Sequence, residues 1–423
     1  MRRKPTLQTP GKPRESRFEG SVRDLTSRGL GVVAHPDGRV FFVPGVWAGE
    51  SGIFEVVKHK GRGGEARLIT LNNASAERIQ APCPHHGFDA VSCGGCPWMF
   101  MSYAQQVEAK QARVEQALTA LNCETLATPL LESDLKLGYR NRAQLKTDGR
   151  QLGFVTPSAA KIAPVDDCLI LSDHNRKTLR HLRTQLPNQE WRPARGKNWT
   201  TLEFDDQLVA TAVTPNLKRP FMQGNSAQNQ RMRHWLYSML ESLAGTLSGT
   251  LSGTPSRSAP ETAADEDSGN TLLLELFAGS GNFTEIAAAA GFSSIVAVDS
   301  FAPAIDALSA RGILGVTAQQ HDLYASKIGT SLSPALAAAD VLLLDPPREG
   351  FKGLGQCIEV ASKLRWIIYI SCDLATFTRD VRSAMERGFE LQSAQGLDLF
   401  PQTPHVEIMS VMKRNPDSQA NSA

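Results

Sequence analysis

The strongest constraint on the fold is a change of pattern after Thr271, where short apolar runs begin to alternate with helical stretches. The runs include TLLLEL, SSIVAVD, VLLLD and RWIIYIS, and their residues are almost continuously apolar. Runs of this kind are typical of parallel strands that helices cover on both faces. We therefore predict an open, mostly parallel α/β sheet over residues 271–414. The closing segment LQSAQGLDLFPQTPHVEIMSVMKR is expected to form a terminal hairpin.

The chain before this sheet divides by composition. Residues 18–78 alternate short apolar runs with turn signals such as Pro36-Asp37-Gly38, which is typical of a small five-stranded, OB-like barrel of the kind that often binds oligonucleotides. Residues 79–244 contain cysteines and a helix and are expected to form a central α+β domain. The remaining segments are a basic tail (1–17), a Gly/Ser/Thr-rich linker or insertion (245–270) and a short tail (415–423), all expected to be disordered.

Composition places the protein in the cytoplasm. We find no secretory leader and no apolar run of membrane-spanning length, and seven cysteines do not suit a disulfide framework. We expect a soluble monomer without membrane contacts. Residues 1–244 carry 33 Lys and Arg against 23 acidic residues, whereas residues 245–423 carry 12 against 20. A basic front half favours a polyanionic partner, although an ordinary solvated surface remains an alternative.

Two basic segments are candidates for contacts with that polyanion. The Gly-rich loop Lys58–Gly64 fits phosphate contacts, and its alternative is a flexible solvated turn. Arg140, Arg142, Lys146 and Arg150 alternate with apolar residues across a turn at Asp148-Gly149. They could line an RNA-facing pair of strands, or a charged sheet face in water.

Clustered cysteines indicate a metal centre. Two residues separate Cys93 from Cys96, Cys83 lies ten positions upstream of Cys93, and Cys168 could complete a set of four thiolates. The spacing is compatible with zinc or with an iron–sulfur cluster and does not separate the two.

Chemically useful residues follow one predicted strand after another. Parallel strands end at the same edge of a sheet, and ligands of open α/β sheets bind there. The Gly279-Ser280-Gly281 loop lets a ligand approach the backbone, and Asp299 is placed to bind a ribose diol. Together with the Asp-Pro-Pro turn they favour adenosylmethionine over a dinucleotide. In chain order, the strand-end candidates are Gly279–Gly281, Asp299, Asp322, Asp345 and Cys372.

Cys372 is expected between the carboxyl end of a strand and the start of a helix. The helix dipole and the free N–H groups should lower its pKa from about 8.5 and favour the nucleophilic thiolate. The alternative is a small residue that fills a strand end.

Several motifs resemble the RNA (uracil-5-)-methyltransferases of the RumA and TrmA type. The matching stretches are FMQGN (Phe221–Asn225), ELFAGSGNFT (Glu275–Thr284), DPPREG (Asp345–Gly350), SCDLATFTRD (Ser371–Asp380) and PHVE (Pro404–Glu407). The resemblance implies a class I, Rossmann-like methyltransferase domain preceded by a TRAM-like barrel and a central iron–sulfur domain. It favours the branch of the family that acts on 23S rRNA.

The resemblance also implies the site residues. A [4Fe-4S] cluster would be bound by Cys83, Cys93, Cys96 and Cys168. S-adenosyl-L-methionine would be bound by Gln223, Phe277, Asn282, Asp299, Asp322 and Asp345, with Asp345 also near uracil. Cys372 would add to C6 of uracil so that C5 attacks the methyl group, and Glu407 would remove the C5 proton.

This sequence departs from the family pattern in three places. The gap between Cys83 and Cys93 is longer than usual, Asp373 replaces the usual Asn, and residues 245–270 are an unusual insertion. Two other functions are weighed against uracil methylation of rRNA: methylation of tRNA, and a non-catalytic RNA-binding assembly factor. An amino-methyltransferase is disfavoured because Arg348 stands where an aromatic residue usually follows the Asp-Pro-Pro turn.

Overall fold

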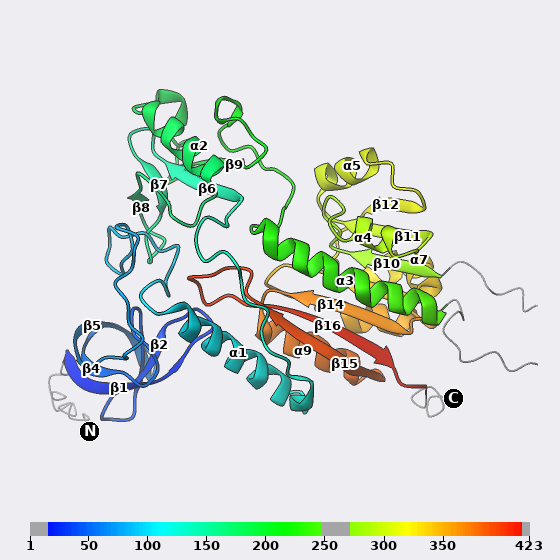
Figure 1. The fold of residues 1–423 in the computed structure, drawn as a ribbon, viewed down its shortest axis with the longest axis horizontal. Helices are drawn as coiled ribbons and strands as arrows, with labels where there is room; N and C mark the ends of the chain where they lie inside the picture. Colours follow the sequence, from blue (N-terminus) through cyan, green and yellow to red (C-terminus); the bar gives the residue numbers. More distant parts are fainter. Residues whose placement is uncertain (1–15, 248–270, 417–423) are drawn as a thin grey trace, which may run out of the picture. The chain divides into compact units, whose positions relative to one another are not determined.

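The computed structural model describes residues 16–247 and 271–416, and these form two compact units (Figure 1). The first contains the chain up to Ser102 together with Val155–Ala163 and Gln402–Pro404; the second contains the other described residues. Most of the predicted tails and linker lie outside the described residues. No helix in the described ranges is both long enough and apolar enough to cross a membrane.

The first unit contains the predicted five-stranded barrel, which is closed in the order β1-β2-β3-β5-β4. Its core is formed by alternate strand residues, among them the fully buried Phe41 and Phe54. Closure depends on Gly63, because a Cβ there would lie 2.0 Å from the carbonyl oxygen of Val40 on the neighbouring strand. The strands are β1 (Arg17–Leu25), β2 (Gly31–Ala34), β3 (Val40–Val43), β4 (Ser51–Lys60) and β5 (Gly63–Asn73).

A smaller sheet of four strands follows in the order β8-β7-β6-β9. Helix α2 packs against β9, and Ser172 caps its first turn by accepting a hydrogen bond from Asn175 N–H. The strands are β6 (Arg142–Thr147), β7 (Leu152–Val155), β8 (Ile162–Pro164) and β9 (Thr200–Asp205). The helices of this part of the chain are α1 (Tyr103–Thr119), α2 (Asp173–Thr184), α3 (Ser226–Leu247) and the 3-10 turns η1 (Glu124–Leu126), η2 (Gln189–Trp191) and η3 (Ala210–Ala212).

The predicted α/β sheet is confirmed, with seven strands in the order β12-β11-β10-β13-β14-β16-β15. Strands β10–β14 are parallel, and β16 is inserted antiparallel between β14 and β15, which confirms the terminal hairpin. The strands are β10 (Leu272–Leu276), β11 (Ser294–Asp299), β12 (Val316–Gln320), β13 (Val341–Leu344), β14 (Trp366–Ser371), β15 (Phe389–Leu397) and β16 (Glu407–Arg414).

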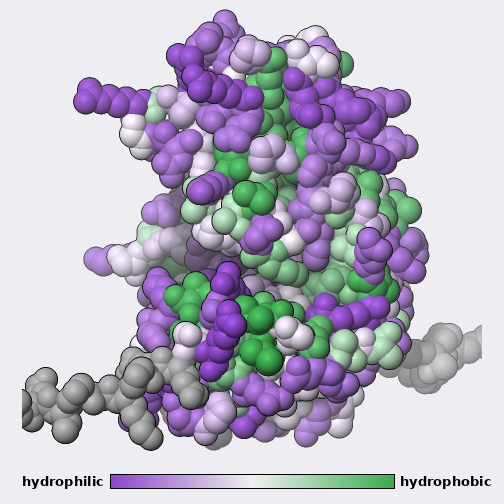
Figure 2. All heavy atoms as spheres, turned by 90° about the vertical axis from the view of Figure 1, so that its left-hand side faces the viewer, coloured by the Kyte–Doolittle hydropathy of each residue, from purple (hydrophilic) through white to green (hydrophobic). Residues whose placement is uncertain are grey.

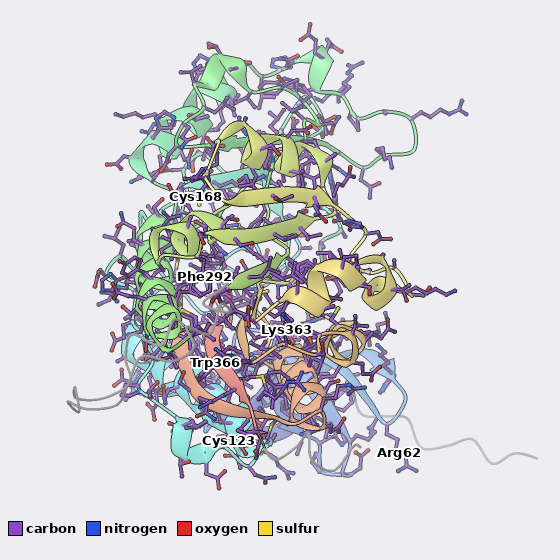
Figure 3. The ribbon with its side chains drawn as sticks, turned by 90° about the vertical axis from the view of Figure 1, so that its right-hand side faces the viewer. Arg62, Cys123, Cys168, Phe292, Lys363 and Trp366 are labelled. Carbon is purple, nitrogen blue, oxygen red and sulfur yellow. The ribbon has the colours of Figure 1, made fainter. Side chains whose placement is uncertain are left out.

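Both faces of this sheet are covered, as the apolar runs predict. Leu342 and Leu344 of β13 belong to one core cluster, whereas Val341 and Leu343 belong to another. The first cluster includes α1 and α9; the second includes α3, α4 and the labelled Phe292 and Trp366 (Figure 3). The helices of this domain are α4 (Thr284–Ala289), α5 (Ala302–Ala310), α6 (Ile328–Ser331), α7 (Ser333–Ala338), α8 (Leu354–Val360) and α9 (Leu374–Met385).

A buried ion pair connects α1 to the loop between β15 and β16. Lys110 Nζ donates to Asp398 Oδ1 at 2.5 Å, and both side chains are fully buried. Tyr103 Oη donates to the other carboxylate oxygen at 2.9 Å, and Lys110 also donates to the carbonyl oxygen of Phe400 at 3.1 Å. The pair is satisfied on both sides, so removing one partner would leave a buried charge without compensation.

We predict that Lys110→Met lowers the free energy of unfolding by about 3–5 kcal/mol, because it leaves the buried Asp398 carboxylate without its cation. The double variant Lys110→Met/Asp398→Asn should be less destabilised than the single one. Urea unfolding followed by circular dichroism measures both. As a control, Arg231→Ala breaks an exposed pair with Asp134 and should cost about 1 kcal/mol or less. A Lys110→Met effect no larger than that control would contradict the prediction.

Candidate active site

Strand register brings the predicted nucleophile and base together. In the antiparallel pair of β14 and β16, Ser371 is opposite Ile408, and Ile370 is opposite Met409. The same register, continued by one residue, places Cys372 opposite Glu407. Side chains directly opposite each other in antiparallel strands have Cβ atoms roughly 4.5–5.5 Å apart. Cys372 remains partly accessible, whereas Glu407 is only 4% exposed.

Asp345 joins this pair from the end of β13. Gln223 Nε2 donates to Asp345 Oδ2 at 3.3 Å, which links the FMQGN segment before α3 to the Asp-Pro-Pro turn. Asp345 also acts electrostatically on both Cys372 and Glu407. Four of the predicted site residues, Gln223, Asp345, Cys372 and Glu407, therefore meet at one edge of the sheet.

The turn after Asp345 is held by Asp380 on α9. One carboxylate oxygen of Asp380 accepts hydrogen bonds from Phe351 N–H at 2.7 Å and from Tyr369 Oη at 2.6 Å. Arg379 pairs with the other oxygen and also donates to the carbonyl of Glu349. Gly350 has φ 66°, and a Cβ there would lie 2.4 Å from Asp380 Oδ2. The sequence shows the DPPREG and TRD motifs but does not reveal that Arg379 and Asp380 of the second motif form hydrogen bonds to the turn of the first.

The electrostatics of Cys372 contradict the expectation from its sequence position. The pKa of the thiol is raised to about 12, first by burial and then by the carboxyl groups of Glu407 and Asp345. Helix α9 does begin beside Cys372, as predicted, but Asp373 caps it by accepting from Thr376 N–H at 2.9 Å. The prediction of a lowered pKa was wrong because burial and nearby acids outweigh the helix end.

The carboxyl groups of the site are themselves difficult to ionise. Burial raises the pKa of Asp345 to about 7, and burial together with Asp345 raises the pKa of Glu407 to about 8. Arg348 opposes the shifts of both Cys372 and Glu407, and its guanidinium lies 3.1 Å from Nε2 of His405. The positive charge of Arg348 does not offset burial and the neighbouring acids, and a cationic ligand would further stabilise the ionised groups of the site.

The Gly loop after β10 leaves room for a ligand. Gly279 has φ 54°, and a Cβ there would meet nothing within 4 Å. Asp299 accepts from Gly279 N–H and from Phe301 N–H, both at 2.8 Å, and so fixes the loop against the end of β11. Phe277 directly follows β10 and has φ 66°, an uncommon conformation for a residue with a side chain, and such strain is often found at ligand sites.

Asn282 and Asp322 lie on the borders of the same loop region. Asn282 exchanges side-chain hydrogen bonds with Asn229 of α3 at 2.9 and 3.0 Å, and Arg233 donates to its carbonyl at 2.6 Å. Asp322 caps the turn after β12 by accepting from Tyr324 N–H at 3.0 Å. The rings of Tyr324 and Phe277 are in contact, with centroids 5.8 Å apart.

The cysteine cluster is not confirmed. Cys83 and Cys93 belong to one turn-rich segment of the first unit, and the pKa of Cys93 is raised first by burial and then by the neighbouring Cys83. Cys96 also belongs to that unit, whereas Cys168 belongs to the second. Within residues 16–247 and 271–416, no group of three or more His, Cys, Asp or Glu side chains is arranged to hold a metal ion. The two neighbouring thiols fit part of a thiolate site.

Two basic side chains of the predicted RNA-facing strands contact other residues of the same sheet and its loops. The guanidinium of Arg142 forms an ion pair with Glu203, which is 6% exposed, and donates to the carbonyl of Pro220. Lys146 Nζ donates to Thr201 Oγ1 at 2.9 Å. Arg142 was therefore misjudged as a surface contact, because alternation alone does not reveal a buried acid on the neighbouring strand.

Comparisons with known proteins match this chain to RNA methyltransferases. A family model described as tRNA (Uracil-5-)-methyltransferase matches residues 335–415, the segment that contains Asp345, Cys372 and Glu407. An uncharacterized RNA methyltransferase of Nitrosomonas europaea is 38% identical over 405 residues, which cover 94% of this chain and 97% of the relative. The 23S rRNA (uracil(1939)-C(5))-methyltransferase RlmD of Pseudomonas putida is 29% identical and covers 96% of each chain.

A solved structure shows the same fold. The tRNA (uracil-54, C5)-methyltransferase of Pyrococcus abyssi, in complex with S-adenosyl-L-homocysteine, aligns with a TM-score of 0.63 at 18% identity. The alignment covers 93% of this chain and all of the other.

We predict that Cys372 reacts with iodoacetamide at about pH 8 at least about tenfold more slowly than a peptide of the same local sequence, because its pKa of about 12 leaves little thiolate. The rate should continue to rise beyond pH 9. Glu407→Gln should accelerate the reaction by removing a repelling carboxylate. Peptide-resolved mass spectrometry separates Cys372 from the other cysteines, and a rate that levels off below pH 8 would refute the prediction.

Proposed function

The chain belongs to the RNA (uracil-5-)-methyltransferase family, and from this we propose that it transfers the methyl group of S-adenosyl-L-methionine to C5 of one uridine in 23S rRNA. The observation that carries the proposal is the register of β14 and β16, which sets Cys372 opposite Glu407 beside Asp345. A nucleophile, a base and a polar group that can bind uracil are the parts that this reaction needs.

Support for rRNA comes from the relatives. The RlmD enzymes of Halomonas elongata and Pseudomonas putida are named for 23S rRNA, and the matches cover 93% and 96% of their lengths. A tRNA substrate is the alternative that the description of the family model favours. A non-catalytic assembly factor is disfavoured because such a protein has no need for a thiol, a buried acid and an Asp-Pro-Pro turn in one place.

The reaction follows from the electronics of uracil. The Cys372 thiolate adds to C6, and the displaced electron pair makes C5 nucleophilic. C5 then takes the methyl group from the sulfonium, which leaves as neutral S-adenosylhomocysteine. Glu407 removes the remaining C5 proton, and the electron pair released expels the Cys372 thiolate and restores the C5–C6 double bond. The target uridine must leave its base stack to reach Cys372.

Because the pKa of Cys372 is raised, the thiol must be induced to ionise before these reaction steps can begin. The bound methyl donor supplies a positive sulfonium charge, which favours ionised Asp345 and Cys372. Arg348 adds a second positive charge from the turn after Asp345. We infer that the thiol stays protonated, and is so protected from side reactions, until donor and RNA are both in place, and that it then gives its proton to water as it adds to C6.

Six residues are proposed to hold the methyl donor. Asp299 would bind the ribose, and the open face of Gly279 would admit the ligand to the backbone. The ring of Phe277 and the side chains of Asn282 and Asp322 border the same loop region. Gln223 and Asp345 connect it to the nucleophile.

We predict that Cys372→Ala abolishes methyl transfer, by at least about 10³-fold, because C5 of uracil is not nucleophilic until a group adds at C6. RNA binding should be retained. Transfer of tritiated methyl groups to 23S rRNA transcripts measures the first effect, and filter binding the second. Cys123→Ala, at a cysteine outside the site, is the matched control. A Cys372→Ala enzyme that still turns over would remove the mechanism.

We expect Glu407→Gln to trap a covalent protein–RNA adduct, because methylation at C5 can proceed while the proton that must leave finds no base. The adduct should appear as a slower band on denaturing gels and should be absent from Cys372→Ala/Glu407→Gln. In the parent enzyme, product release should quicken as pH rises toward about 8, where Glu407 ionises. Free RNA alone in the Glu407→Gln lane would point to another base.

We also propose that Cys83, Cys93, Cys96 and Cys168 bind a [4Fe-4S] cluster, supported by the interaction of the first two thiols. Anaerobically purified protein should be brown and contain about four irons per chain. Cys93→Ser should lose this iron, whereas Cys123→Ser should keep it. A colourless protein with one zinc would overturn the cluster.

A further inference from the structure

The most basic segment described outside the active site is α2 together with the loop that follows it. Between Ser172 and Trp199 the chain carries seven Lys and Arg and only two acidic residues, Asp173 and Glu190, for a net charge of +5. We define the α2 surface by six exposed cations of this segment, namely Lys177, Arg180, Arg183, Arg192, Arg195 and Lys197.

The helix separates its residues by chemistry. Asn175, Thr178, Leu179 and Leu182 are buried, and α2 packs them toward β9 and η3. The opposite face carries Lys177 and Arg180, three residues apart and therefore on neighbouring turns. In Figure 2 most side chains around the upper end, where Figure 1 draws α2, are hydrophilic, with a narrow hydrophobic stripe between them.

Internal contacts account for only part of this charge. Arg180 lies 3.7 Å from Asp167, and Arg183 donates to the carbonyl of Asp166 near the end of α2, where a cation also stabilises the helix dipole. The side chains of Lys177, Arg192, Arg195 and Lys197 make no hydrogen bond or ion pair within the described part of the chain. Arg192 packs beside the turn at Gly149, next to the exposed Arg150.

We propose that the α2 surface binds the phosphate backbone of the RNA substrate, at a distance in sequence from every residue of the catalytic site. The inference rests on the proposed function, which supplies RNA as the partner. Clustered cations on one surface repel each other, and a polyanion removes that cost while releasing counterions. The contacts would position the RNA without reading its sequence.

The test is the salt dependence of RNA binding by the full-length protein. The variant Lys177→Gln/Arg192→Gln/Lys197→Gln should reduce the slope of log K against log salt by about 2 to 3, since each lost phosphate contact removes about 0.7–0.9. Affinity for a 23S rRNA transcript should fall at least about tenfold in moderate salt. The single variants should each reduce the slope by about 1, which guards against misfolding of the triple variant.

A matched control removes three exposed lysines from the methyltransferase domain. Lys327→Gln/Lys352→Gln/Lys363→Gln changes the net charge equally, and Lys363 lies shortly before β14 (Figure 3). The control should leave the slope unchanged. An equal loss of slope in both triple variants would mean that only the net charge of the protein matters, and this would overturn the inference. An unchanged slope in the α2 variant would also overturn it. This holds even if the α2 variant had lost binding to an acidic protein, because the proposal concerns RNA.

Failure of this inference and failure of the proposed function can be separated. Methyl transfer by the unaltered enzyme to 23S rRNA tests the function. With transfer intact, an α2 variant of unchanged slope refutes the surface alone. If the surface acts as proposed, the variant should raise the KM for the transcript and leave kcat nearly unchanged. The reason is that the α2 surface would bind the RNA equally strongly in the ground state and in the transition state.

Discussion

The active site depends on the pairing of β16 with β14. A strand that closed the sheet in parallel would bring a different residue to the end of β14, and a shift of one residue would turn Glu407 to the opposite face. The antiparallel register instead places one buried carboxyl across from Cys372. The neighbouring interactions, from the Lys110–Asp398 pair to the hydrogen bonds of Asp380, hold the loops on either side of this pairing.

Burial controls the chemistry of the site in two opposing ways. It shields the proposed nucleophile and the proposed base from water, and it makes both costly to ionise, as the raised pKa values of Cys372, Glu407 and Asp345 indicate. A sulfonium ligand would add a positive charge to that of Arg348. Under the proposed mechanism, binding of the methyl donor therefore favours the reactive form of the thiol.

Much of the fold was predictable because it depends on local patterns. Continuous apolar runs indicated parallel strands, and the chain order of Asp299, Asp345 and Cys372 indicated a shared edge. Three properties were not predictable, because each depends on residues distant in sequence. The pKa of Cys372 depends on Glu407, and Arg142 is held in an ion pair by Glu203. The turn at Gly350 depends on hydrogen bonds to Asp380. The donor-binding roles and the cysteine cluster remain predictions.

The position of β16 in the sheet has a consequence for the biosynthesis of the enzyme. This strand is made after β14 and β15 yet lies between them, so a nascent chain that stops short of it has two unpaired strand edges and a thiol without its partner carboxylate. If Glu407 is the base, as we propose, catalytic competence arises only when β16 is inserted. On the proposed mechanism, a ribosome that has not yet translated β16 holds a precursor that is unable to complete a round of methylation on RNA.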